Sequence, residues 1–178
     1  MDGGAVPKDR STNQSTLLVA ALLQNSRILT VKMGRITVDG MDASRVLTSL
    51  LIRLRYDAIL LSGISFGGFN LIDLKRLSQA TRRPVIAVTG ERPSNAAVRS
   101  ALRKHFADWK ERWRIVENAG RLYSCKPLPE EPKLFFEVRG TSSQSAKRII
   151  ISSAAISRLP EPVRVAGLLA RGLKPLFA

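Results

Sequence analysis

The length and composition of this chain exclude several classes of protein. It has 178 residues, of which 44% are hydrophobic and 24% charged, so it is too apolar for a disordered chain and long enough for one domain with a buried core. Its longest apolar run, Leu17 to Leu23, is far shorter than the roughly 18 residues that span a bilayer. The polar, formally neutral segment before that run is unlike a secretory signal. We therefore expect no membrane association.

The charge balance indicates a negatively charged partner. Lys and Arg number 29 against 14 Asp and Glu, a formal net charge of +15, and so few acids cannot pair with all the bases. Most of the bases are Arg, whose planar guanidinium matches phosphate oxygens. DNA or RNA is the expected partner, and the surface of an acidic protein is the alternative.

The chain has one cysteine, Cys125, and one histidine, His105. Disulfide frameworks and Cys/His zinc sites are therefore excluded, and a reducing cytoplasm is the expected compartment. His105 falls in a predicted helix beside Phe106, so we interpret it as a surface or packing residue. The sequence leaves the oligomeric state open, a homo-oligomer included.

The first part of the chain predicts an arm, a hairpin and a helix. Residues 1–15 are polar and rich in Gly, Ser and Asn, which is typical of a flexible arm. Residues 16–23 are apolar, Asn25-Ser26 is a turn signal, and residues 27–38 alternate, so the two segments predict a β-hairpin. Asp42 then reads as the N-cap of an amphipathic helix that runs to Leu54.

The rest of the chain alternates between strands and helices. The expected strands are residues 58–61, 84–88, 121–124 and 133–138, and the expected helices are residues 71–80, 94–118, 143–157 and 161–173. Short apolar strands separated by helices are typical of parallel strands covered on both faces. We therefore expect residues 16–178 to form one α/β domain with a mixed sheet.

One face of the predicted helix over residues 94–118 is basic. Arg99, Arg103, Lys110 and Arg114 share that face if the helix is unbroken, and they form either a solvated surface or a stripe that follows phosphates. Trp109 and Trp113 fall on the opposite, apolar stripe, so we interpret both as core residues.

Carboxylates and one glycine-rich loop are the candidates for chemistry. Asp42 is explained as a cap and Asp73 by the dipole of the following helix, which leaves Asp39 and the isolated Asp2 as the two acids for a Mg²⁺ or Mn²⁺ site, with no obvious third ligand. The loop from Ser62 to Asn70 follows a buried strand, where open α/β sheets bind ligands.

That loop matches neither a P-loop nor a dinucleotide fingerprint. Gly67 and Gly68 either let backbone amides approach a phosphate or sugar, with Asn70 beside them, or form a tight turn packed for shape.

Four segments together resemble a known archaeal family. They are Ile36 to Ala43, Leu61 to Asn70, Lys104 to Trp109, and Leu159 to Ala166 with its Leu-Pro-Glu-Pro-x-Arg element ending at Arg164. These segments are similar to the endonuclease-dU-like family, which is related to endonuclease V, and the resemblance covers nearly the whole chain. It implies a ribonuclease-H-like fold with helices on both faces of the sheet. In active members it implies divalent-metal cleavage of a phosphodiester near a damaged base.

The resemblance also implies where catalytic groups belong. Asp2 and Asp39 match two acidic positions of the family, whereas Ser62 stands where an aspartate is usual and Gly167 where a His or Asp is expected. A serine hydroxyl binds hard cations weakly and glycine offers no ligand. In this fold a central strand precedes the position of Asp2, so we expect either an upstream start of the native chain or an unfilled pairing position.

Three hypotheses follow. The first is a basic nucleic-acid-binding protein of this family whose nuclease activity is weak or lost, with Gly67, Gly68, Asn70, Arg164 and the basic stripe as its contacts. The second is an active Mg²⁺- or Mn²⁺-dependent endonuclease that recruits Asp73 or another carboxylate. The third is an interaction module for an acidic protein.

Overall fold

The structure is a computed structural model that describes residues 14–173. Asp2 and most of the expected N-terminal arm therefore lie outside the described residues. Within residues 14–173, no helix is long and apolar enough to cross a membrane.

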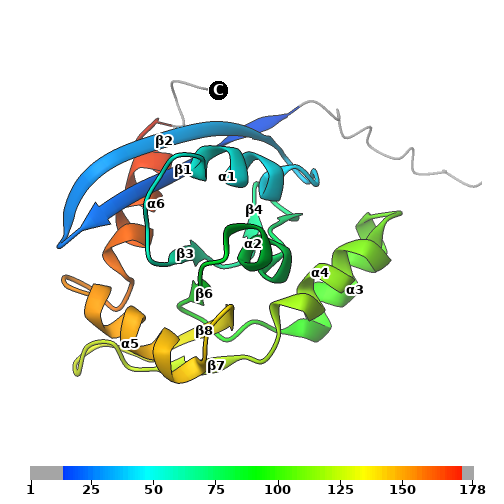
Figure 1. Cartoon of the computed structure of the whole chain (residues 1–178). Helices are drawn as coiled ribbons and strands as arrows, with labels where there is room; N and C mark the ends of the chain where they lie inside the picture. Colours follow the sequence, from blue (N-terminus) through cyan, green and yellow to red (C-terminus); the bar gives the residue numbers. More distant parts are fainter. Residues whose placement is uncertain (1–13, 174–178) are drawn as a thin grey trace, which may run out of the picture.

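The chain begins with the expected β-hairpin, which forms a long, curved two-stranded sheet (Figure 1). Strands β1 (Ser15–Gln24) and β2 (Arg27–Thr37) pair antiparallel over their whole length. Asn25 and Ser26 connect them with φ of 47° and 64°. These left-handed values are typical of the two-residue turns whose twist matches that of the strands.

A separate four-stranded sheet forms the centre of the molecule. Its order is β3 (Ile59–Ser62), β6 (Val85–Thr89), β8 (Leu134–Arg139) and β7 (Tyr123–Cys125). Strands β3 and β6 are parallel and the other pairs antiparallel, so the expected mixed sheet is confirmed. A small hairpin of β4 (Ser65–Phe66) and β5 (Asn70–Leu71) lies between β3 and the next helix.

Helices cover both faces of this sheet, as the resemblance implied. On one face, α1 (Ala43–Leu51), α2 (Leu74–Thr81) and the end of α4 (Trp109–Ala119) pack on alternate residues such as Val85 and Ala87. On the other face, α5 (Ser143–Ser153) and α6 (Glu161–Leu173) pack on Ile86 and Val88. The alternation of core residues along β6 is what separates the two layers.

The helix expected over residues 94–118 is two helices, α3 (Asn95–His105) and α4, so the prediction of an unbroken helix is wrong. Phe106 adopts an extended backbone, with φ −132° and ψ 128°. Its ring packs edge-on against Phe69 and lies 4.2 Å from the Arg112 guanidinium. These contacts draw Phe106 inward, and the basic stripe is divided between two helices.

The two sheets do not pair with each other in the described part of the chain. There, β1 pairs with β2 and β3 pairs with β6, while a cavity of about 750 Å³ lies between β1 and β3. Among residues 14–173 no strand lies between β1 and β3, and the choice between an upstream start and an unfilled pairing position stays a prediction.

Candidate functional site

Asp39 lies in a turn directly after β2, at φ 57°. The turn packs against the glycine-rich loop: the Asp39 amide donates to the Gly67 carbonyl at 2.8 Å, and the Phe69 amide donates to Asp39 Oδ1 at 2.8 Å. Asp and Asn tolerate this left-handed conformation better than most residues. The half-buried carboxylate is thus held by backbone atoms of a loop 30 residues further along the chain.

Gly67 and Gly68 are explained by this close packing. Both have positive φ, 52° and 81°, which favours glycine. A side chain at Gly68 would collide with the Asp39 carboxylate, and one at Gly67 would come within 2.7 Å of Thr16. The glycines therefore bring the loop against the Asp39 turn and β1, which is the role of a turn packed for shape.

Asn70 takes over the capping role that the sequence predicts for Asp42, so that prediction is wrong for the Asp42 side chain. Asp42 does not cap α1 with its side chain, and Asn70 Oδ1 instead accepts the amide of Ala43 at 2.9 Å. Asp42 accepts from the amide and hydroxyl of Thr37 and from the Asn70 amide. Burial opposes ionisation of Asp42, but these hydrogen bonds outweigh it and lower its pKa.

These hydrogen bonds leave Asn70 no role as a contact to nucleic acid. Its side chain is completely buried and donates to the Thr37 carbonyl as well as to Asp42. A side chain in this position holds the turn and the start of α1, and it does not present an amide to a ligand at the surface.

Arg112 is a site residue that sequence reasoning missed. It is only 5% exposed, and its guanidinium donates to Asp108 Oδ1 at 2.9 Å, to the Gly40 carbonyl at 3.0 Å and to the Phe69 carbonyl at 2.8 Å. These bonds tie α4 to both sides of the Asp39 turn. In the sequence, Asp108 and Arg112 are four residues apart, as in an ordinary ion pair on a helix surface. That spacing alone does not indicate that Arg112 is buried.

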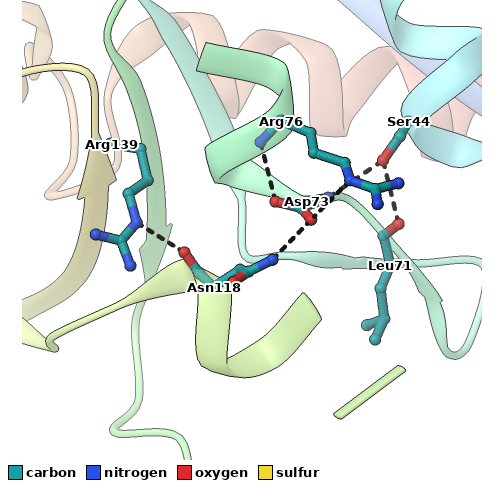
Figure 2. Close-up of polar contacts among 6 residues, drawn as sticks. All are labelled: Ser44, Leu71, Asp73, Arg76, Asn118 and Arg139. Atoms are coloured by element: carbon teal, nitrogen blue, oxygen red, sulfur yellow. Dashed lines mark hydrogen bonds and ion pairs between the residues drawn. The ribbon is translucent and has the colours of Figure 1, made fainter. Parts of the chain in front are cut away.

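Asp73 stands at the centre of a buried polar network (Figure 2). It caps α2 by accepting the Arg76 amide at 3.0 Å, and it accepts the Asn118 side-chain amide at 3.0 Å. The Asp73 amide in turn donates to the Ser44 hydroxyl at 3.2 Å. Arg139 of β8 donates to the Asn118 carbonyl at 2.7 Å. The network joins α1, α2, α4 and β8, and it accounts for Asp73 as a structural carboxylate.

Ser62 and Gly167, the two departures from the family pattern, line the same cavity between β1 and β3. Ser62 is exposed at the end of β3, and Gly167 is half-buried on α6. Both positions line this cavity, and neither side chain supplies a carboxylate or imidazole there.

Arg164, on the same helix as Gly167, is engaged by a neighbour. Its guanidinium forms a two-pronged ion pair with the buried Glu161, with donor to acceptor distances from 2.7 to 3.1 Å. The hydrogen bonds from Arg164 lower the pKa of Glu161 despite its burial. Arg164 therefore helps to fix the first turn of α6 and keeps only part of its surface in solvent.

Apart from the buried Arg112, the Arg and Lys residues of α3 and α4 are exposed. Arg99 lies 5.4 Å from the Trp113 ring, and Arg103 and Lys110 lie 5.4 and 5.9 Å from the Trp109 ring. The tryptophans are partly buried against Leu102 and Val116, as expected of core residues. Their rings support the cations, which remain exposed to solvent.

The described donors do not make up a divalent-cation centre. No cluster of three or more His, Cys, Asp or Glu side chains occurs among residues 14–173. Of the positions at which the resemblance predicts metal or proton-transfer groups, Asp39 is a described carboxylate, Asp2 lies outside the described residues, and Ser62 and Gly167 carry no acid. A centre with two hard cations needs several converging oxygen ligands, and this donor set does not fit one.

The described residues form a mixed α/β domain of the ribonuclease-H-like fold, similar in structure to endonuclease V. The family model described as endonuclease dU matches residues 1–174, and the chain belongs to that family. It is 35% identical over 159 residues to a UPF0215 protein of Thermococcus gammatolerans, covering 87% of this chain and 80% of the relative.

Two solved structures are similar to this fold. A crystal structure of a protein of unknown function from Archaeoglobus fulgidus has a TM-score of 0.76 and 25% identity, and the match covers 90% of this chain and 98% of that one. Endonuclease V of Ciona intestinalis, crystallised with a 24mer DNA containing an inosine followed by a ribo-adenosine, has a TM-score of 0.57 and 14% identity over 92% of this chain and 86% of that chain. At that identity the likeness shows the fold alone.

Proposed function

We propose that this protein binds DNA or RNA through the basic surface of α3 and α4, and that its nuclease activity is weak or lost. The observation that carries the proposal is the position of that surface: Arg112 joins α4 to the Asp39 turn and to the glycine-rich loop. Phosphates bound along α3 and α4 would therefore lie beside the position where the family places its chemistry.

The charge of the surface supports this function. Arg99, Arg103 and Lys104 on α3 line a shallow depression with Ala96 and Ser100, and Lys110 and Arg114 extend the positive charge along α4. Arg supplies two parallel donors to a phosphate. Basic surfaces of this kind bind the backbone and follow it without reading bases.

The proposed loss of activity rests on the donor set. Ser62 stands where a carboxylate is expected, and its hydroxyl is a poor ligand for a hard cation. Gly167 stands where an imidazole or a carboxylate is expected, and it has no ligand atom in its side chain. If Mg²⁺ or Mn²⁺ binds, Asp39 and Asp2 are the residues expected to hold it.

Fluorescence anisotropy with labelled single- and double-stranded oligonucleotides tests the binding. We expect the affinity to fall by about 100-fold between 50 and 200 mM salt, as it does when about four phosphates are neutralised. The variant with Arg99→Glu and Arg103→Glu should bind at least about tenfold more weakly on every sequence.

The matched control reverses two exposed basic residues on the opposite face of the sheet, Lys147→Glu with Arg148→Glu on α5. It changes the net charge equally and should keep most of the affinity. Equal losses of affinity in both variants would contradict the proposed surface, because they would show that binding depends on net charge alone. No binding at low salt would contradict the proposal and favour the module that binds an acidic protein.

A second function, an active endonuclease that cuts DNA near deaminated bases in repair, is favoured by one observation. Asp39 matches a family acidic position and is held in a built turn by Phe69 and Gly67. Incubation of deoxyuridine- or deoxyinosine-containing DNA with and without Mn²⁺ separates the two functions. Strong Mn²⁺-dependent cutting that Asp39→Asn abolishes would establish the enzyme, whereas weak or absent cutting supports the binding protein.

A further inference from the structure

Helices α1 and α2 end in the same unusual way. Within two residues of the end of each helix the backbone is left-handed, with φ 63° at Arg53 and 54° at Arg82. This position is usually glycine, because a side chain makes the left-handed conformation costly. Both helices place an arginine there instead. The fold itself needs no guanidinium at either position, so the two side chains require another explanation.

The helix dipole does not account for these arginines by itself. A cation near the C terminus of a helix is stabilising, but it acts equally well in the last helical turn, where the backbone is relaxed. Neither α1 nor α2 has a basic residue in its last turn. Residues that keep a costly backbone conformation are found most often at functional sites.

The two helix ends lie at one edge of the central sheet. Strands β3 and β6 are parallel, with Ile59 beside Val85, and the Ile59 amide donates to the Pro84 carbonyl at 2.9 Å. The segments that lead from α1 into β3 and from α2 into β6 therefore enter the sheet side by side (Figure 1). Burial raises the pKa of Tyr56 and the charge of Arg83 opposes that rise, which places Arg83 close to the other segment.

These two segments, residues 52–58 and 82–84, carry four exposed arginines that we call the arginine edge: Arg53, Arg55, Arg82 and Arg83. Asp57 is the one acid in the two segments. Within residues 14–173, none of the four guanidinium groups forms a hydrogen bond or an ion pair. The arginine edge therefore presents uncompensated positive charge to solvent.

Arg139 adds a further cation at the same end of the sheet. It pairs with Val85 at the end of β8, and the next residue, Gly140, packs so closely that a Cβ there would lie 3.0 Å from the Arg83 carbonyl. The half-buried guanidinium donates from Nε to the Asn118 carbonyl at 2.7 Å, and no carboxylate among residues 14–173 pairs with it. Because buried charges are usually paired, this arrangement favours an anion from outside the chain.

The chemistry of the arginine edge fits phosphates better than the surface of a protein. All its cations are arginine, whose fork donates two parallel hydrogen bonds to an anion. A protein interface also needs an apolar centre, and Ile52 is the exposed large apolar side chain that the two segments offer. One isoleucine beside four arginines is typical of a surface that binds nucleic-acid backbone.

We propose that the arginine edge binds the phosphates of a second nucleic-acid segment, separate from the one on α3 and α4. The arginine edge lies where β3 and β6 begin, whereas α3 follows the opposite end of β6. One protein molecule then holds two segments, at opposite ends of the central strands. The proposal rests on the proposed function for the class of ligand, but not on the residues of α3 and α4.

Titration of the whole chain with a fluorescent DNA hairpin tests the proposal. The hairpin has a stem of about ten base pairs, which is one helical turn. The edge variant is Arg53→Gly with Arg82→Gly, and the α3 variant is Arg99→Glu with Arg103→Glu. A third protein combines all four changes.

The matched control is Lys147→Gln with Arg148→Gln. Both residues are exposed on α5, which packs on the other face of the sheet. The control therefore lowers the net charge by the same amount as the edge variant without touching either surface.

We expect the parent and the control to bind about two hairpins per molecule, the edge and α3 variants about one each, and the combined variant none at concentrations that saturate the parent. Glycine relieves the left-handed strain, so the thermal midpoint of the edge variant should equal or exceed that of the parent. An arginine with a structural role would instead lower the midpoint when it is replaced.

The variants separate this proposal from the proposed function. Full binding by the α3 variant together with lost binding in the edge variant would contradict the proposed function and support the arginine edge. Unchanged binding by the edge variant together with lost binding in the α3 variant would do the reverse.

Four further results would overturn the proposal. An equal loss in the control would mean that net charge alone decides binding. A lower thermal midpoint of the edge variant would make the arginines structural. A single hairpin per parent molecule, weakened by both variants, would mean one long site. Displacement of one hairpin by a polyglutamate peptide at lower concentration than by unlabelled DNA would assign the arginine edge to an acidic protein.

Discussion

Asp73 and Asp39 each lie two residues after the end of a strand, β5 and β2 respectively, yet the structure uses them in opposite ways. Asp73 is 4% exposed and joins three helices through the Arg76 amide, the Asn118 side chain and Ser44 (Figure 2). Asp39 is half-buried in a left-handed turn at the edge of the glycine-rich loop. The same type of side chain therefore joins several helices in one region and lies half-buried against a loop in the other.

The difference bears on the active-endonuclease hypothesis. That hypothesis recruits Asp73 as a ligand, but a cation would have to displace the cap of α2 and the bond to Asn118, and it would have to reach a buried carboxylate. Asp39 therefore stays the predicted carboxylate of the proposed endonuclease among the described residues. The four predictions below test this division between anchor and site.

The largest expected effect belongs to the anchor. Asp73→Ala removes the cap of α2 and leaves the Asn118 amide without its acceptor, which should cost about 3 kcal/mol of unfolding free energy. Urea unfolding measures the loss. Asp73→Asn keeps an oxygen for the Arg76 amide and should cost about half as much. A loss below about 1 kcal/mol for the alanine variant would contradict the anchor role.

Arg112 should come next, because it fixes the position of the Asp39 turn. Arg112→Met keeps an apolar side chain in place but leaves the Gly40 and Phe69 carbonyls and Asp108 without a donor, which should cost about 2 kcal/mol. Arg114→Met, an exposed change on the same helix, should stay within about 0.5 kcal/mol. If the two variants unfold alike in urea, Arg112 does not hold the turn.

The sequence predicts the secondary structure of the molecule better than the side-chain contacts of its candidate site. Alternating residues on either side of Asn25-Ser26 are a local signal, and the hairpin formed as expected. The capping of α1 is not local: Asn70 reaches Ala43 from 27 residues away and releases Asp42 for another role. The break at Phe106 likewise depends on Phe69, and the burial of Arg112 depends on Gly40 and Phe69. Such long-range contacts leave no trace in periodicity.

Glu161 should have the third-largest effect on stability, because it is a buried carboxylate whose partner, Arg164, is only partly buried. Hydrogen bonds from Arg164 lower its pKa, so the stabilisation is present above the unfolded pKa of about 4.3 and is lost as pH falls through the lower folded pKa. Glu161→Gln should cost about 1 kcal/mol at pH 7 and less as the solution is acidified below about pH 4. Urea unfolding at several pH values measures this convergence. The exposed Glu130→Gln is the control, and a constant difference between Glu161→Gln and the parent at all pH values would contradict the ion-pair account.

The smallest effect on stability is expected at the site itself. Asp39→Asn keeps an oxygen that can accept from the Phe69 amide, and asparagine tolerates the left-handed backbone of this turn. The free energy of unfolding should therefore change by about 0.5 kcal/mol or less. Because the variant removes one negative charge from the protein, DNA affinity at low salt should rise slightly. Urea unfolding and anisotropy on the same preparation measure both quantities.

A loss of stability as large as that of Asp73→Ala would make Asp39 a second anchor. Unchanged stability with any residual cutting abolished would identify Asp39 as the carboxylate on which that activity depends.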